Sequence, residues 1–169
     1  MIEFPSVAVL GTGSMGGAVL AGLLGTDVLI QDGIWTTNRS PASAALVPIH
    51  PNVTSMDTTN DPQANRIAVR NASIVIVAVK PYMIHDLLTE VHGDFRPDAI
   101  VVSVAAGVSL ATLEELLPEF VVSLRAMSNT PAAIKMGVTG LTRGNRATVA
   151  QYELIKQVFL TVGEVVTVD

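Results

Sequence analysis

The sequence predicts an α/β fold in which helices cover both faces of a mostly parallel, doubly wound sheet. Short apolar runs alternate with helix-length segments along the 169 residues, which is the pattern of such a sheet. The run at residues 74–79 (IVIVAV) has no polar alternation, as expected for a strand buried on both faces. Hydrophobic residues make up 49% of the chain and charged residues 15%, which favours one sizeable core over disorder.

The expected elements follow in order along the chain. The strands are expected at residues 7–10, 33–38, 74–79, 99–104, 120–124, 138–142 and 165–168. The helices are expected at residues 16–24, 81–91, 109–117 and about 146–160. Ser40 and Ser109 are predicted N-caps, with Pro41 at the first helical position after Ser40. Residues 48–64 are polar and turn-rich, and no element is assigned there.

Composition argues against several classes of protein. Ten Lys and Arg against fifteen Asp and Glu give a net charge of -5, which disfavours nucleic acid as a partner. The absence of cysteine excludes disulfides, thiolate metal sites and a cysteine nucleophile, and the three histidines have no metal-ligand spacing. The uncharged stretch at residues 5–26 follows Glu3 instead of a basic segment, and glycines interrupt it. We therefore expect no metal, no membrane partner and a cytoplasmic location.

A glycine-rich segment follows the first expected strand and opens the first expected helix. It has the pattern G-x-G-x-x-G and consists of Gly11, Thr12, Gly13, Ser14, Met15 and Gly16. In this pattern the first glycine permits a tight turn, the second lets backbone approach a pyrophosphate, and the third lets helix and sheet pack closely. The helix N-terminus then offers free N–H groups and a partial positive charge. The segment predicts a Rossmann dinucleotide-binding domain.

The second expected strand of the sheet ends in Asn38, Arg39 and Ser40, where an NAD site would place Asp or Glu. An arginine between two neutral donors suits the 2′-phosphate of NADP, whereas a carboxylate would repel it. One unit charge pair at about 4 Å is worth roughly 4 kcal/mol at an effective dielectric near 20. We therefore predict that NADPH is preferred over NADH.

Three further turns are expected at the carboxyl edge of the sheet, where open α/β sheets bind ligands. The first comprises Ala78, Val79, Lys80 and Pro81, and the second comprises Ala105, Ala106 and Gly107, whose small side chains would let a flat ring lie against backbone. The third begins at Arg125. In it, Thr130 with Pro131 forms a natural N-cap and first helical position.

In combination these segments resemble one family, the pyrroline-5-carboxylate reductases. VAVLGTGSMGGAVLAGLL, AVKP, VVSVAAGV, RAMSNTPA and VGEVVTVD occur in the order and approximate spacing of that family. AVKP together with RAM-x-NTPA is the most specific part, although Ser128 replaces the usual proline. The resemblance implies an oxidoreductase of proline biosynthesis that reduces the imino acid 1-pyrroline-5-carboxylate to L-proline with NAD(P)H.

The resemblance also implies roles for individual residues. Residues 11–16 would hold the pyrophosphate, residues 38–40 the 2′-phosphate, and Asn65 a ribose. Residues 78–81 and 105–107 would line the cofactor, and Met127, Asn129 and Thr130 would face nicotinamide and substrate. No catalytic residue is assigned.

We expect residues 1–169 to form only the dinucleotide-binding domain. The helical C-terminal domain of the family, through which its members form homo-oligomers, would be absent from this chain. Such a fragment is expected to be weakly active or inactive by itself. Two alternatives stay open, namely another NADP-dependent imine or β-hydroxyacid reductase and a non-catalytic dinucleotide-binding module.

Overall fold

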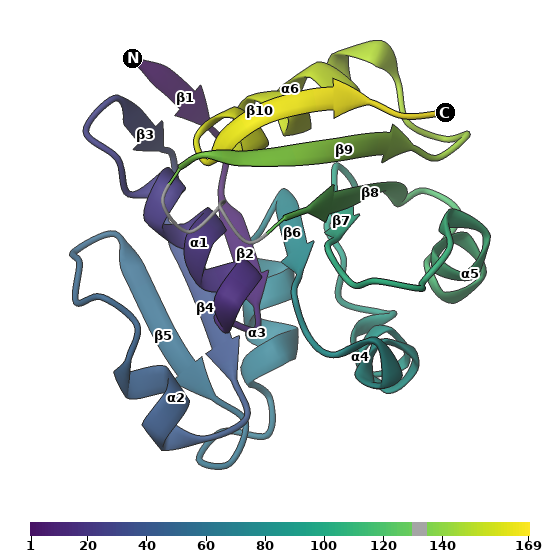
Figure 1. The fold of residues 1–169 in the computed structure, drawn as a ribbon. Coiled ribbons are helices and arrows are strands. Elements are labelled where there is room, and N and C mark those ends of the chain that lie inside the picture. The colour runs from purple at the N-terminus through teal and green to yellow at the C-terminus, as the bar shows by residue number, and fades with distance from the viewer. Residues whose placement is uncertain (130–134) are drawn as a thin grey trace.

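An eight-stranded sheet forms the centre of the fold (Figure 1). The computed structural model describes residues 1–129 and 135–169. Across the sheet the strands run in the order β10 (Gly163–Thr167), β9 (Gly137–Arg143), β8 (Val122–Ser128), β7 (Ile100–Ser103), β6 (Ile74–Val77), β2 (Val7–Leu10), β4 (Ile34–Asn38) and β5 (Val53–Asp57). Neighbouring strands are parallel, except that β8 and β9 are antiparallel. The predicted mostly parallel sheet is confirmed.

The remaining elements are helices and a small second sheet. The helices are α1 (Ser14–Leu23), α2 (Pro41–Ala45), α3 (Ala64–Arg70), α4 (Ile84–Val91), α5 (Leu110–Leu116) and α6 (Val149–Leu160), and the 3₁₀ turn η1 (Pro81–Met83) precedes α4. Strands β1 (Ile2–Phe4) and β3 (Val28–Ile30) pair in parallel as a separate two-stranded sheet. Within the described residues, no helix is both long and apolar enough to span a bilayer.

The central strands are apolar throughout because each face of the sheet is covered. In β6, Ile74 and Ile76 belong to one buried cluster, and Val75 and Val77 belong to the other. Helices α1 and α6 cover the first face, and α3, α4 and α5 cover the second. Since successive side chains of a strand point to opposite faces, burial on both sides removes the polar alternation from the sequence.

Local sequence sets where several helices begin. The Ser40 and Ser109 hydroxyls each accept a hydrogen bond from the backbone N–H three residues later, which confirms both predicted N-caps. Helix α6 begins at a capping box in which Thr148 and Gln151 bond each other's backbone N–H. That cap places the start of α6 three residues after the expected position near residue 146.

Four strands differ from the sequence expectation in extent or were not expected. The strand expected at residues 120–124 instead runs from Val122 to Ser128, because residues 124–128 pair with β9 and extend the ladder. Strand β5 lies within the unassigned residues 48–64, and as an edge strand it carries the partly exposed sequence VTSMD without an apolar run. Strands β1 and β3 have three residues each, too few to show a period.

An acidic side chain at the amino edge of the sheet joins β6 to β7. Ser73 Oγ donates to Asp98 Oδ2 at 2.7 Å, and Arg96 Nε donates to Asp98 Oδ1 at 3.2 Å. Burial raises the pKa of the Asp98 carboxyl, but the hydrogen bond from Ser73 and the charge of Arg96 outweigh it, so the pKa lies below its ordinary value.

The lowered pKa predicts an acid-dependent contribution to stability. Ionised Asp98 stabilises the fold above the pKa of the unfolded chain, about pH 4, and this contribution is lost as pH falls through the lower folded pKa. We expect Asp98→Asn to be less stable than the wild type at pH 6, with the difference shrinking toward pH 3. Urea denaturation at a series of pH values measures this. A difference that grows on acidification would contradict the assignment.

Candidate functional site

A cleft of about 940 Å³ opens at the carboxyl ends of β2, β4, β6 and β7. Strands β2 and β6 are neighbours in this sheet, with β4 and β5 on one side of the pair and β7 and β8 on the other. The order of strands therefore reverses between β2 and β6. A reversal of this kind separates the loops above the two strands and creates the crevice in which open α/β sheets bind ligands.

The glycine loop 11–16 forms one wall of the cleft and is tightly packed beneath it. Gly11 has a φ of 91°, and a Cβ there would lie 2.7 Å from the carbonyl oxygen of Ala78. A Cβ on Gly16 would collide with the carbonyl oxygen of Gly11. Gly13 lines the cleft, and a Cβ there would have nothing within 4 Å. The first and third glycines are therefore required by packing, while the second leaves space on the cleft side.

Helix α1 directs its free N-terminus at this loop. Its first helical hydrogen bond runs from Gly17 N to Gly13 O at 2.8 Å, so the amides of residues 14–16 have no partner within the helix. The N-cap Gly13 offers no side-chain acceptor, and the first turn holds no acidic residue. Uncapped amides at the positive end of a helix dipole form a binding site for an anion such as a phosphate.

The end of β4 contributes the next part of the rim. The Asn38 amide bonds Thr12 of the glycine loop, with Thr12 N to Asn38 Oδ1 at 3.1 Å. Arg39 is exposed and lines the cleft, and no described carboxylate forms an ion pair with it. Its carbonyl accepts from Thr59 Oγ1 at 2.7 Å, which fixes the backbone of this turn.

Ser40 has a structural role in the same turn. Its hydroxyl caps α2 by accepting from Ser43 N at 3.1 Å, and it is not among the residues that line the cleft. Ser43 and Thr58 do line the rim beside Arg39. Sequence reasoning missed both because they lie in α2 and in the polar segment after β5, where no pattern distinguishes them.

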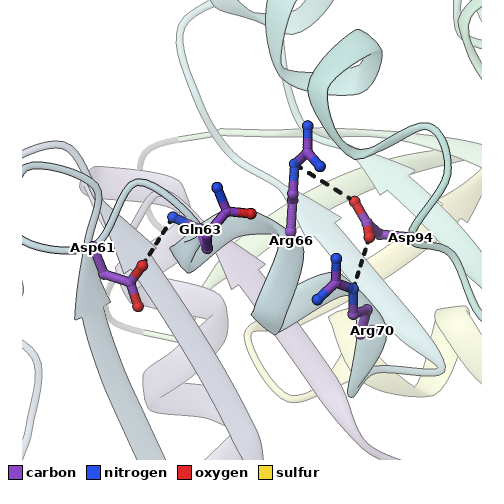
Figure 2. A network of polar contacts seen from close by, with 5 residues as sticks. All are labelled: Asp61, Gln63, Arg66, Arg70 and Asp94. Carbon is purple, nitrogen blue, oxygen red and sulfur yellow. Dashed lines mark hydrogen bonds and ion pairs between the residues drawn. The ribbon is translucent and has the colours of Figure 1, made fainter.

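Helix α3 brings Asn65 to the cleft. Thr37 Oγ1 at the end of β4 donates to Asn65 Oδ1 at 2.7 Å. The N-terminus of α3 is preceded by a turn in which Gln63 N donates to Asp61 Oδ1 at 2.9 Å (Figure 2). The structure thus places Asn65 at the cleft, on a helix that the sequence pattern did not predict.

An ion-pair cluster holds the rest of α3 against the loop after α4 (Figure 2). Arg70 Nε lies 2.7 Å from Asp94 Oδ1, and Arg66 Nε lies 3.8 Å from Asp94 Oδ2. The Asp94 side chain is nearly buried, whereas both arginines are substantially exposed. The short Arg70 bond and the longer Arg66 contact link the helix that carries Asn65 to the loop after α4.

The turn after β6 and the turn after β7 line the facing wall. The lining residues predicted from the sequence are Ala78, Val79, Lys80, Pro81, Ala105 and Ala106. Besides Ser43 and Thr58, the lining residues of the whole cleft that the sequence reasoning missed are Thr37, Pro62, Tyr82, Met83, Asp86, Leu87, Glu90 and Val104. Many of the missed residues lie on η1 and α4, whose packing over the cleft depends on the tertiary fold and leaves no local signal.

Several predicted residues lie outside the lining of the cleft. Thr12, Gly16, Ser40 and Gly107 are next to it in sequence but do not line it. Met127 is exposed at the end of β8, and Asn129 Oδ1 accepts from Val138 N at 3.0 Å. Neither lines the cleft, and Thr130 lies outside the described residues. That Met127, Asn129 and Thr130 face the nicotinamide and the substrate stays a prediction.

Comparison with known proteins identifies the family. The profile of the family described as "NADP oxidoreductase coenzyme F420-dependent" matches residues 6–107, more than half of the chain. The chain belongs to this family. The matched region contains the glycine loop, the turn at Arg39, Asn65 and both turns of the facing wall.

Individual relatives match almost the whole chain. A protein named pyrroline-5-carboxylate reductase from Corynebacterium melassecola is 32% identical over 96% of this chain and 59% of its own length. A solved pyrroline-5-carboxylate reductase from Coxiella burnetii is 28% identical with a TM-score of 0.78, over 96% of this chain and 58% of that one. The Plasmodium falciparum pyrroline carboxylate reductase, solved with NADP bound, has a TM-score of 0.81 and 19% identity, over 100% of this chain and 59% of that one. The chain thus spans less than two thirds of these relatives.

The packing of the glycine loop predicts a difference between two glycine substitutions. Gly16→Ala forces a Cβ against the Gly11 carbonyl and should lower the free energy of unfolding by about 1–3 kcal/mol, as overpacking does. The control Gly93→Ala adds a Cβ with nothing within 4 Å and should change stability by no more than about 0.5 kcal/mol. Chemical denaturation compares the two. Equal effects would contradict the requirement for glycine at position 16.

Proposed function

We propose that this chain is the dinucleotide-binding part of a pyrroline-5-carboxylate reductase, which uses NADPH to reduce 1-pyrroline-5-carboxylate to L-proline. The observation that carries the proposal is the cleft at the strand reversal, whose walls lie within the part of the chain that is similar to relatives of that name. The alternatives of a β-hydroxyacid reductase or a non-catalytic module are not favoured, because the similarity to these relatives extends over 94–99% of the chain.

The residues of the cleft suit NADPH. The free amides at the start of α1 would take the pyrophosphate, and the open side of Gly13 leaves room for it. The Arg39 guanidinium on the rim would take the 2′-phosphate, because a phosphate accepts charge-assisted hydrogen bonds from arginine. Asn65 would contact a ribose, and the small residues Ala105 and Ala106 would lie against the nicotinamide.

The chemistry requires little from this chain beyond binding and orientation. A reduced nicotinamide held in this cleft would supply a hydride, which a protonated imine can accept without a further acid. The walls at Ala78 and Ala105 would orient the ring and exclude water from it. We propose that Met127, Asn129 and Thr130 face the imino acid, and that further substrate contacts and the homo-oligomer interface come from segments matching the rest of the relatives' length.

The charge of Arg39 predicts a selective loss of affinity. Arg39→Ala should weaken NADPH binding by roughly tenfold to a hundredfold, since a hydrogen bond to a charged group is worth about 1.5–3 kcal/mol, and should leave NADH binding unchanged. Titration of the bound dinucleotide's fluorescence measures both affinities. The control Arg96→Ala removes an arginine at the opposite edge of the sheet and should alter neither. An equal loss for both dinucleotides would refute the role of Arg39.

The proposed reaction predicts a division between binding and turnover. Residues 1–169 should bind NADPH but oxidise it very slowly with pyrroline-5-carboxylate, because part of the relatives' length has no counterpart here. The protein at the full length of its gene should reduce pyrroline-5-carboxylate and be inactive on β-hydroxy acids. Efficient proline formation by residues 1–169 would contradict the first expectation, and a preference for β-hydroxy acids would contradict the second.

A further inference from the structure

The side chain of Asn38 reaches back across the carboxyl edge of the sheet to the glycine loop. Its Oδ1 accepts from Thr12 N at 3.1 Å, and its Nδ2 donates to Thr12 Oγ1 at 2.8 Å. The two residues are 26 positions apart and come from the ends of adjacent parallel strands, β2 and β4. A backbone N–H can only donate, so the atom of the Asn38 amide that meets Thr12 N must be the acceptor Oδ1.

The backbone on both sides of this contact is also fixed. Gly11 N donates to Thr37 O at 2.9 Å, and Thr58 N donates to Asn38 O at 2.9 Å. These bonds hold the backbone at Thr37 and Asn38 between β2 and the turn after β5, and the Asn38 side chain is held by its bonds to Thr12. Thr12 has its amide and its hydroxyl engaged by one side chain and does not line the cleft.

We infer that Asn38 is a positioning residue that holds the glycine loop in its binding conformation. The sequence suggested that Asn38 contacts the 2′-phosphate directly. Asn38 does line the cleft, but both polar atoms of its amide are bonded to Thr12. Its effect then passes through Thr12 to the amides of residues 14–16, which would face the pyrophosphate. Because NADPH and NADH both contain a pyrophosphate, Asn38 supports the binding of both alike, whereas Arg39 favours the one that carries a 2′-phosphate.

The inference rests on the proposed function, and it is tested by measuring the binding of NADPH and NADH to the wild type and to five variants. Asn38→Ala removes both bonds to Thr12. It should weaken the binding of NADPH and of NADH by the same factor, roughly tenfold. Asn38→Asp keeps an acceptor for Thr12 N–H, so its affinity for NADH should stay within about twofold of the wild type, while its negative charge should weaken NADPH. The control Asn71→Ala removes an exposed asparagine that bonds only its own helix, and it should change neither affinity.

A variant of Thr12 keeps the test decisive if Asn38→Ala folds poorly. Thr12→Val removes the hydroxyl but keeps the backbone N–H. It should weaken the binding of both dinucleotides equally, by a few-fold. In the double variant Thr12→Val with Asn38→Ala, the loss should match that of Asn38→Ala alone, because both changes break the same contact.

The outcomes distinguish a failure of the positioning role of Asn38 from a failure of the proposed dinucleotide-binding function. A loss confined to NADPH in Asn38→Ala would make Asn38 a 2′-phosphate ligand and overturn the inference while leaving the proposed function in place. Unchanged binding of both dinucleotides in Asn38→Ala, or additive losses in the double variant, would also overturn it. A wild-type chain that binds neither dinucleotide would instead overturn the proposed function itself.

Discussion

The close approach of the glycine loop to the end of β6 is the constraint on which the candidate site depends. Gly11 turns the chain at a positive φ directly against the Ala78 carbonyl, and Gly16 lets the first turn of α1 pass the Gly11 carbonyl without a clash. These contacts bring the helix N-terminus over the reversal between β2 and β6. A bulkier loop would move the free amides away from the cleft. The same two glycines therefore allow both the close packing and the binding of an anion.

The parts of the fold that could be predicted are those whose physics is local. Burial on both faces leaves continuous apolar runs, and these identified the central strands β2, β6 and β7. The Ser40 and Ser109 caps are short-range hydrogen bonds and could also be found from sequence. The glycine spacing identified the loop at residues 11–16. The ends of the apolar runs identified the turns at Ala78 and Ala105.

What could not be predicted depends on contacts between distant segments. The extension of β8 to Ser128 needs the antiparallel partner β9. The edge strand β5 has no apolar run because its side chains are only partly covered on the faces of the sheet. The wall that η1 and α4 add to the cleft follows from how the helix lies on the sheet. The sequence indicated a polar residue at Asn38 but could not show that its amide turns toward Thr12.

A crystal structure of this chain with NADPH is the most direct test of the site. We expect the pyrophosphate to lie against the backbone amides of residues 14–16 and the 2′-phosphate to contact the Arg39 guanidinium. We also expect the bond between Asn38 and Thr12 to persist in the complex. A dinucleotide bound elsewhere on the molecule would contradict the site, and a molecule that binds no dinucleotide at saturating NADPH would contradict both the site and its ligand.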